Sequence, residues 1–559
     1  MKYLYPYFLF CSVLLLIGCS GGSNPDSTIN AFEGEPNSSA IETCYDVQIT
    51  NASNVNNKII CTTLENSGYN GLGAARFMRF TVNSPATVSI RATRVSGLNP
   101  ADPDIILYRN GVVMRRANTF NFNSEILTIN LSAGNYVAEV NEYSYLENDE
   151  KSSLNFQVQQ KSQINNVSQS TSPPSNCATG NDSNVSGNVT FSRVNNSGSA
   201  LNYNNITYPP VQQAVVEVLC NNGVYSSSTT NSNGDYLLNF PNNENAFVRV
   251  KAQMLNAGNW DFSVVDNATS GQPVYVMDGS VFNDNRNIIR NLRAGVGGWD
   301  NFNYTETRVA APFAILDSVR KAKEKILSVA SVSFPALKIN WSPDNSAANN
   351  TGTFYNGSEI FLSGRENVDT DEYDEHVIIH EWAHYFEDKF SRSDSIGGIH
   401  GLADILDIRV AFGEGFGNAF SAMVLDDPYY VDTSGLQQSQ AFSINMDNNN
   451  CINAGWHSEC SVQSILYDIY DATNEGGDTL NMNFSFIYNV LIGEQKNTQA
   501  LTSIFSFIKS LKDQNVANAN AIDALLGAQN IDSVSDVYGS SQITSNPGQT
   551  NQLPIYEAY

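Results

Sequence analysis

Short runs of alternating polar and apolar residues fill the first part of the chain. Residues 77–82 (FMRFTV), 86–91 (ATVSIR) and 136–140 (YVAEV) are examples, and turn-forming residues separate them. Alternation with a period of two predicts strands that bury one face. We therefore expect an antiparallel β-sandwich over residues 41–160.

A second set of short strands is predicted over residues 177–290. The runs VSGNVTF, AVVEVLC and FVRVKAQ resemble strands of a carboxypeptidase-regulatory-like, transthyretin-type sandwich, with Asn233-Gly234 as a hairpin turn. Residues 161–176 are rich in Ser, Asn and Pro, which is typical of a linker. The runs ADPDIILYRNG and LSAGNYVAEV of the first region resemble the pre-peptidase β-domains of secreted bacterial peptidases. We assign no chemistry to either sandwich.

The hydrophobic period changes near residue 296. The stretch RVAAPFAILDSVRKAKEKILSVA has apolar residues at helical spacing, ALKINW is typical of a strand, and Asn356-Gly357 predicts another hairpin turn. Helical patterns dominate the residues that follow. We expect a multidomain chain in which an α+β, mainly helical domain over residues 296–545 follows two all-β sandwiches.

The first 18 residues predict export from the cytoplasm. An apolar run from Phe8 to Ile17 is too short to span a bilayer and fits the core of a signal peptide. Leu16-Ile17-Gly18-Cys19 resembles the lipobox of bacterial lipoproteins, which implies a lipid on Cys19 as the mature N-terminus. Ser20 resembles the outer-membrane sorting class, and residues 19–40 are small and polar, as in a tether. The alternative is an ordinary secretory signal.

Cysteine usage agrees with an oxidising compartment. Once Cys11 is removed with the signal and Cys19 carries lipid, six cysteines are left. Local pairing would give three disulfides: Cys44–Cys61, Cys177–Cys220 and Cys451–Cys460. The sequence has no Cys-x-x-Cys pair, which argues against a thiolate zinc site.

The charge balance restricts the partners. The formal net charge is −26, so nucleic acid and anionic lipid surfaces are excluded as favourable partners. Attachment to the membrane would depend on the lipid at Cys19 alone.

The stretch His-Glu-Trp-Ala-His at residues 380–384 is the chief candidate for chemistry, because the chain has only five histidines. On a helix, His380 and His384 lie one turn apart and both imidazoles face the same side. They can bind one zinc ion, with Glu381 placed to act as a general base on a water. The alternative is an exposed helix with two solvated histidines.

A catalytic zinc ion needs a third protein ligand. Position 390 is Phe rather than His, which excludes the compact metzincin pattern. A glutamate from a later helix is the other source, and Glu414 lies in Gly413-Glu-Gly-Phe-Gly417 within a helical pattern over residues 404–424. Each Gly costs a helix about 1 kcal/mol relative to Ala, which is tolerated where backbones approach closely. Asn418, one turn later, could orient a liganding His. The alternative is a Gly-rich loop with Glu414 in solvent.

These motifs, His380-Glu381-x-x-His384 and Glu414-x-x-x-Asn418, resemble those of the gluzincins, the thermolysin-like zinc peptidases. The resemblance implies a zincin fold, zinc as the cofactor and a peptide or protein as the substrate. It also implies that residues 352–355 form an edge strand that pairs with the substrate backbone. The family often has Asp where this chain has Asn418.

The resemblance further implies a His or Tyr that stabilises the oxyanion. His457, between Cys451 and Cys460, is the first candidate and Tyr467 the second; the alternative for His457 is a surface loop residue. We expect His376 to be a helix-face residue and His400 a loop residue.

The acids that precede the His380 helix are a further candidate site. Asp369, Asp371 and Asp374 could bind calcium, although compensation of the helix dipole is the favoured explanation for them.

The sequence therefore predicts a zinc metallopeptidase anchored in the bacterial cell envelope. The alternatives are a surface binding or adhesion protein with a structural zinc domain, and a zinc hydrolase that acts on a non-peptide amide.

Overall fold

The computed structural model describes residues 177–542, with short gaps at 178–179, 222, 300–302, 350–351, 449 and 473–479. Before residue 177 it describes strands β1 to β10 and a few residues that join them, and after residue 542 it describes one strand. That strand, β29 (Ile555–Ala558), pairs with β1 (Gly34–Asn37). The predicted signal peptide, Cys19, most of the tether and the linker 161–176 lie outside the described residues, as do the side chains of Cys44 and Cys61.

Two antiparallel-rich sheets form the first β-sandwich, as the alternating pattern predicts. The first sheet has the order β3 (Lys58–Thr62), β10 (Ser153–Lys161), β5 (Ala86–Ser96), β8 (Ser124–Leu131). The second has the order β2 (Cys44–Ile49), β4 (Arg76–Val82), β9 (Gly134–Glu142), β6 (Pro103–Arg109), β7 (Val112–Ala117). Apolar side chains on the facing sides, such as Phe80, Ile90, Leu107 and Tyr136, form one hydrophobic core.

Strand β6 is buried on both of its faces, as is the middle of its neighbour β9. Ile105 and Leu107 point into the core of the sandwich, whereas Ile106 and Tyr108 belong to the core that the helical part of the chain shares. A continuous apolar run of this kind is expected for a strand covered on both sides. The first sandwich therefore packs against the helical part through the outer face of β6.

The second β-region shares its sheet with the helical part. One small sheet contains β11 (Asp182–Phe191), β16 (Asp235–Pro241), β20 (Ile288–Ile289) and β21 (Leu292–Ala294), and β12 (Arg193–Asn196) pairs with β13 (Leu201–Thr207). The eight-stranded sheet has the order β15 (Gly223–Thr229), β14 (Ala214–Cys220), β17 (Ala246–Asn256), β18 (Trp260–Asp266), β22 (Leu337–Trp341), β24 (Ile360–Leu362), β23 (Phe354–Tyr355), with β19 (Val276–Asp278) beside β17.

The join between the two regions is the parallel pairing of β18 with β22. Strands from both sides of residue 296 are therefore hydrogen-bonded into one sheet.

The described residues after β21 contain seven α-helices, and the expected helices near residues 308–330 and 404–424 are among them. They are α1 (Ala311–Leu327), α2 (Glu375–Phe390), α3 (Ile408–Leu425), α4 (Glu459–Tyr470), α5 (Phe484–Val490), α6 (Ile504–Gln514) and α7 (Ala519–Ala528). A second small sheet lies beside them, with the order β25 (Gly364–Arg365), β26 (Asp369–Thr370), β27 (Tyr429–Ser434), β28 (Gln440–Asn445).

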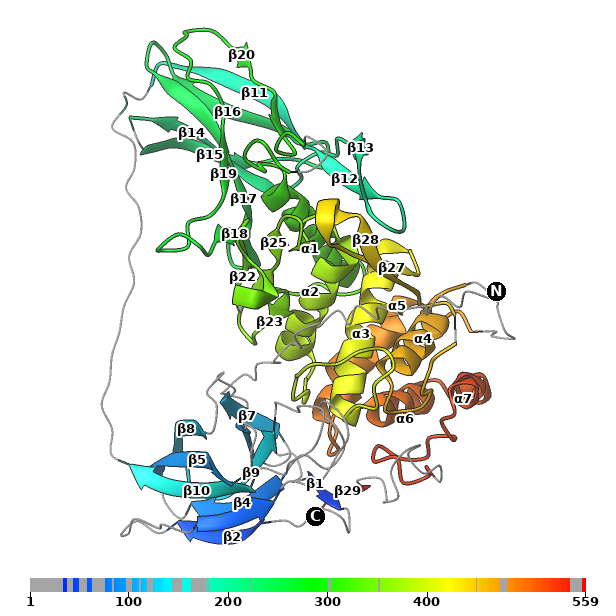
Figure 1. Ribbon diagram of the computed structural model, residues 1–559. Helices are drawn as coiled ribbons and strands as arrows, with labels where there is room; N and C mark the ends of the chain where they lie inside the picture. The colour runs from blue at the N-terminus through cyan, green and yellow to red at the C-terminus, as the bar shows by residue number, and fades with distance from the viewer. Residues whose placement is uncertain are drawn as a thin grey trace, which may run out of the picture.

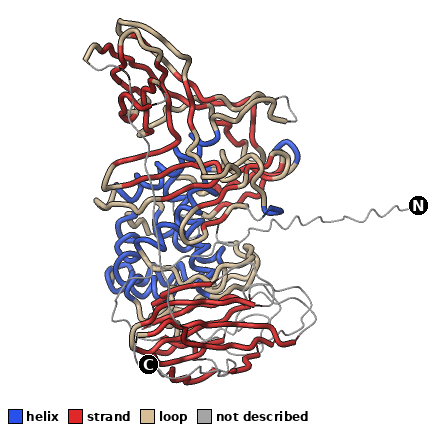
Figure 2. The backbone as a smooth tube through the Cα atoms, turned by 90° about the vertical axis from the view of Figure 1, so that its left-hand side faces the viewer, coloured by secondary structure: helices blue, strands red, loops and turns tan. Residues whose placement is uncertain are grey.

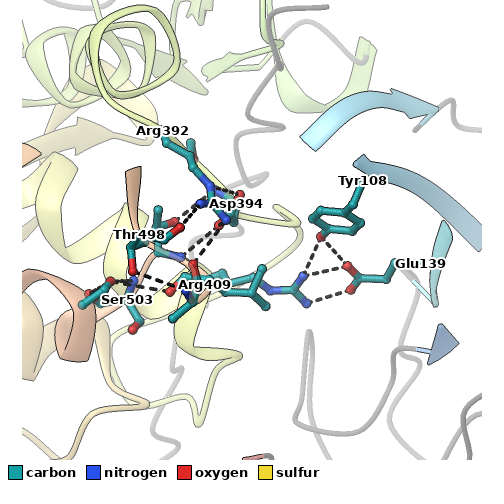
Figure 3. A network of polar contacts seen from close by, with 12 residues as sticks. Tyr108, Glu139, Arg392, Asp394, Arg409, Thr498 and Ser503 are labelled. Carbon is teal, nitrogen blue, oxygen red and sulfur yellow. Dashed lines mark hydrogen bonds and ion pairs between the residues drawn. The ribbon is translucent and has the colours of Figure 1, made fainter. Parts of the chain in front are cut away.

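The helices lie between the two strand-rich regions (Figures 1 and 2). Arg409 at the start of α3 crosses to the first sandwich, where both of its Nη atoms donate to Glu139 of β9 at 2.8 Å. Tyr108 of β6 accepts a further bond from Arg409 at 3.1 Å and donates to Glu139 (Figure 3). In the described part of the chain, no helix has the length and apolar character needed to cross a membrane.

Candidate metal centre

Helix α2 places the two histidines of the HEWAH motif inside the protein. Glu375 lies in its first turn, where a negative charge is favourable, and nearly every residue from His376 onward is buried. The side chains of His380 and His384 extend from the same face, one turn apart, with ring centroids 4.7 Å from each other. The alternative of an exposed helix with solvated histidines is therefore wrong.

Glu414 of α3 completes a set of three converging atoms. The Nε2 atoms of His380 and His384 are 2.9 Å apart, and Glu414 Oε2 lies 3.1 Å from the first and 3.4 Å from the second. Four ligands about 2.0–2.1 Å from a tetrahedral zinc ion lie about 3.3 Å from one another. The other carboxylate oxygen, Glu414 Oε1, is buried and accepts no hydrogen bond from any described residue. This donor set fits a zinc ion.

The glycines of α3 explain how a second helix comes so close. The stretch is helical, so the alternative of a Gly-rich loop is wrong. A Cβ atom on Gly417 would lie 2.8 Å from the ring of His380, and one on Gly415 would lie 2.6 Å from Val462 of α4. Both distances are shorter than real Cβ contacts, so α3 needs these glycines to approach α2 and α4 together.

Asn418 fixes the orientation of the His380 ring. Its Nδ2 donates to Gln463 at 2.8 Å, so its Oδ1 is the atom that faces His380 Nδ1, also at 2.8 Å. An amide oxygen can only accept, so His380 carries its proton on Nδ1 and presents the lone pair of Nε2 to the site.

His400 is the residue that sequence reasoning left out of the site. It lies in the connection between α2 and α3, as expected, but its ring is buried and reaches the site. His400 Nε2 lies 3.3 Å from Glu414 Oε2, and Nδ1 lies 2.6 Å from Glu459 Oε2 at the start of α4. The scarcity of histidine in this chain was the signal that could have drawn attention to it.

Buried charges shift the pKa values of these groups. Burial alone would raise the pKa of Glu414, but the charges of His400 and His384 hold it well below its usual value. Burial lowers the pKa of His400, yet the carboxylates of Glu414 and Glu459 raise it to about 10. The pKa of His380 is raised by its bond to Glu414 and by the charge of Glu381, against the effect of burial. The site thus holds an ionised glutamate among imidazoles, and Glu381 lies close enough for its charge to raise the pKa of His380.

Comparison with known proteins finds a family match within the helical part of the chain. Residues 328–526 match the family described as the Mycolysin C-terminal domain. This range covers less than half of the chain but contains the three converging residues, Glu381 and His400. The match relates the chain to thermolysin-family peptidases and indicates proteolysis as the class of activity. No curated protein matches the chain.

Three solved structures show weak likenesses to parts of this chain. The pre-peptidase C-terminal domain of collagenase from Bacillus anthracis is 14% identical with a TM-score of 0.16, and covers 21% of this chain and 97% of its own. PliG, a periplasmic lysozyme inhibitor from Aeromonas hydrophila, is 11% identical with a TM-score of 0.15, over 21% of this chain and 96% of its own. The major pilin subunit BcpA of Bacillus cereus is 7% identical with a TM-score of 0.11, over 42% and 70%.

In the described part of the chain, neither His457 nor Tyr467 has a hydrogen bond, ion pair or ring contact with the three converging residues. His457 is buried against the Trp456 ring, and burial lowers its pKa to about 4. Its Nδ1 has no partner, and in the described part of the chain no hydrogen bond or ion pair joins it to His380, His384 or Glu414. Tyr467 is buried on α4 beside Tyr470. The role predicted for either residue at the oxyanion stays a prediction without a supporting contact.

Two of the three expected disulfide bonds lie within the described residues, and both are present. Cys451–Cys460 closes the loop that contains His457 immediately before α4, and Cys177–Cys220 fixes the end of β14. The pair Cys44–Cys61 lies outside the described side chains.

Strand β23 is the edge of the eight-stranded sheet and covers the last two residues of the edge strand expected over 352–355. It pairs antiparallel with β24 through Phe354 and Tyr355 and has no neighbour on its other side among the described strands. Tyr355 is fixed by a 2.8 Å bond from its hydroxyl to Asp388, one turn after His384 on α2. The edge strand is therefore tied to the helix that carries the histidines.

Proposed function

We propose that this protein is a zinc-dependent metallopeptidase that hydrolyses peptide bonds. The observation that supports the proposal most is the convergence of His380 Nε2, His384 Nε2 and Glu414 Oε2 within 3.4 Å of one another. A glutamate, Glu381, adjoins them on α2, and the family match covers the same residues. The proposed fold class of this part is a zincin.

His380, His384 and Glu414 would hold the zinc ion, which when bound supplies a Lewis acid for the scissile carbonyl. Glu381 takes the proton of the attacking water and passes it to the leaving amine. Asn418 keeps the Nε2 lone pair of His380 available, because its Oδ1 accepts a hydrogen bond from Nδ1–H and so holds the proton on the opposite nitrogen.

The substrate backbone would bind along β23. An edge strand offers unpaired N–H and C=O groups, and an extended peptide can add to it as a further strand. Because Tyr355 of β23 bonds to Asp388 of α2, a peptide on this edge would run close to the histidines. We expect side chains on the substrate to matter less for this pairing than its extended backbone.

We propose that His400, rather than His457, donates a hydrogen bond to the oxygen that gains charge during attack. Its ring is oriented by Glu459, whose Oε2 lies 2.6 Å from Nδ1, so that Nε2 points to the converging atoms, 3.3 Å from Glu414 Oε2. Such a donor is worth about 3–4 kcal/mol of transition-state stabilisation. The competing possibility is that His400 is a fourth metal ligand, which would close the site and make it structural.

The test compares hydrolysis of casein and the bound zinc of the whole chain in three proteins. We expect Glu381→Gln to keep its zinc and to lose activity by a factor of about 100 to 10,000, because only the base is removed. Glu494→Gln is the matched control, since Glu494 is exposed on a turn of helix far along the chain. Equal activity in wild type and Glu381→Gln would exclude the mechanism.

A fourth protein, His400→Ala, separates catalysis from structure. If His400 is an oxyanion donor, His400→Ala should keep its zinc and lose activity by about 100-fold or more. Loss of zinc together with stability would identify a closed structural site and would favour the binding-protein alternative.

The location in the cell is a separate proposal. We propose that Cys19 carries lipid and anchors the protein to the bacterial outer membrane, because residues 16–19 resemble a lipobox and Ser20 resembles the outer-membrane sorting class. Replacement of Cys19 by Ser should release the protein from the membrane fraction. Unchanged fractionation of that variant would exclude the anchor.

A further inference from the structure

The first sandwich holds the connection between α2 and α3, which carries His400. Arg116 of β7 donates from Nη1 to the carbonyl oxygen of Ser395 and from Nη2 to that of Ser393, the second at 3.2 Å. Strand β7 belongs to the first sandwich, whereas both serines lie just after the end of α2. A side chain 279 positions away from Ser395 thus binds the main chain shortly before His400.

This contact sets the course of the backbone. One planar guanidinium donates to two carbonyl groups of the same loop, so it fixes both the place and the direction of the main chain. The Nε atom of Arg116 is buried and has no hydrogen-bond partner among the described residues. A half-buried charge whose bonds go to neutral groups stabilises a fold only weakly. The geometry that Arg116 imposes on the loop is therefore the better explanation for this residue.

Two glycines separate the contact from His400. Gly397 and Gly398 have φ angles of 66° and 108°, which residues with a side chain rarely adopt. Glycine restricts its own backbone less than any other residue, so contacts from outside must fix the chain here. The amide of Gly397 donates to Ser395 Oγ at 3.2 Å, which ties the first glycine to the residue that Arg116 holds.

Two contacts together define the position of His400. Glu459 Oε2 lies 2.6 Å from Nδ1 of the ring and sets the rotation of the ring. Arg116 sets, through Ser395, the point from which the main chain runs toward the ring. With both contacts in place, His400 Nε2 lies 3.3 Å from Glu414 Oε2.

The loop has further anchors in the helical part, and these do not depend on Arg116. On the side of α2, Arg392 donates to the carbonyl oxygen of Thr498 at 2.7 Å (Figure 3). On the side of α3, the amide of Leu406 donates to the carbonyl oxygen of His457 at 2.9 Å. Replacement of Arg116 should therefore loosen the stretch between these anchors and leave the helices folded.

We propose that Arg116 is a positioning residue for the reaction, because it holds the loop where His400 reaches the metal centre. The proposal rests on the proposed role of His400 at the oxyanion. Arg116 acts through Ser395 and not on the substrate. A displacement of about 1 Å in a group that contacts the transition state can cost about 100-fold in rate. The first sandwich thereby supports catalysis from outside the site.

The first test is kinetic and uses the whole chain loaded with zinc. Arg116→Met keeps a long side chain but removes its donors, and we expect kcat on fluorescein-labelled casein to fall about tenfold or more. KM and zinc content should stay within a factor of about two of wild type, because neither the substrate strand nor the metal ligands change. Arg116→Lys keeps the charge and can reach one carbonyl group, so it should recover part of the loss.

The matched control is Arg115→Met. Arg115 is the preceding residue of β7 and is exposed, so its replacement removes the same charge from the same strand. Its kcat should equal that of wild type. An equal loss in Arg115→Met and Arg116→Met would overturn the proposal, because the charge of β7 rather than the contact with the loop would then be the cause.

A double-variant test separates positioning from a general effect on the fold. When His400→Ala is already present, no His400 is left to position, so adding Arg116→Met should change kcat by less than about twofold. The same loss of about tenfold with and without His400 would show that Arg116 acts by another route and would overturn the proposal.

Hydrogen exchange examines the loop without any catalysis, in proteins that all carry Glu381→Gln to prevent self-digestion. Peptides over residues 396–402 contain the amide of Gly397, and they should exchange about ten times faster in Arg116→Met than in the parent. Arg115→Met should exchange like the parent. Unchanged exchange of these peptides in Arg116→Met would overturn the proposal.

These outcomes differ from a failure of the proposed function. Equal hydrolysis by wild type and Glu381→Gln would refute the peptidase, and hydrogen exchange over residues 396–402 would then decide whether Arg116 holds the loop. If Glu381→Gln is inactive while Arg116→Met keeps the kcat of wild type, the peptidase stands and the positioning role is wrong.

Discussion

The two β-regions are attached to the helical part in different ways. The second region is joined by backbone hydrogen bonds, because β18 and β22 are parallel neighbours in one eight-stranded sheet. The first sandwich is joined by side chains, through the outer face of β6 and the bonds of Arg409 to Glu139. Two regions that share a sheet cannot separate unless the backbone hydrogen bonds between their strands break. Two regions joined only by side chains can separate while each keeps its own strands. We therefore expect the second region to unfold with the helices and the first sandwich to be separable.

The largest effect is expected at the shared sheet. Phe262 of β18 is fully buried and contacts the rings of Phe334 and Tyr385 on the helical side. Phe262→Ala should cost about 3–5 kcal/mol, because it leaves a cavity at the join. In calorimetry the second region and the helices should unfold in one transition, and the Tm of that transition should fall. The Tm of the first sandwich should not change. Separate transitions for the second region and the helices would refute the shared-sheet account.

The next effect concerns the side-chain interface. Arg409 and Glu139 are both almost fully buried, so Glu139→Gln should cost about 3 kcal/mol by removing one of the two carboxylates that pair with Arg409; the other is Asp407. Replacing both residues, as Glu139→Leu with Arg409→Met, should recover only part of that loss, because Asp407 then loses its partner. Asp278→Asn in the half-exposed Arg249–Asp278 pair of the second region is the control and should cost less than about 1 kcal/mol. Denaturant unfolding measures these proteins together with the single variants Glu139→Leu and Arg409→Met, and additive losses at positions 139 and 409 would contradict a coupled pair.

The smallest effect is a pH dependence at the inner edge of the second region. Lys323 of α1 is buried under Trp260 and Gln213, and burial lowers its pKa from 10.5 to about 8. Between pH 8 and 10.5 the unfolded chain binds more protons than the folded chain, so this residue makes stability rise with pH in that window. Lys323→Met should be more stable than wild type by about 1–2 kcal/mol at pH 7, with a smaller gain at pH 10. An equal gain at both pH values would show that charge burial is not the cause.

The sequence was informative where the signal is local. His380 and His384 are one helical turn apart, so their common face follows from helix geometry alone. The glycines around Glu414 also indicated that this helix approaches another closely. In the structure Gly417 lies against His380 and Gly415 against Val462. Strand alternation was similarly sufficient to predict the two β-regions.

The sequence was uninformative where position depends on distant contacts. His400 lies in a connection without a periodic pattern, and its place is fixed by Glu459 and by Arg116 of the first sandwich, which bonds to the carbonyl groups of Ser393 and Ser395. No spacing rule relates residue 116 to residue 395. Asp369 and Asp371 could be picked out from the sequence as acids before α2. Asp432 could not be linked to them, because the pairing of β26 with β27 brings it there.

The central claim is that His380, His384 and Glu414 hold one zinc ion that keeps an open position. Crystals of Glu381→Gln grown with zinc, measured at the zinc absorption edge, test it most directly. We expect one anomalous peak about 2.0–2.2 Å from His380 Nε2, His384 Nε2 and a Glu414 carboxylate oxygen, with His400 outside bonding distance. A peak elsewhere, or one bonded also to His400 with no position left for water, would contradict the account.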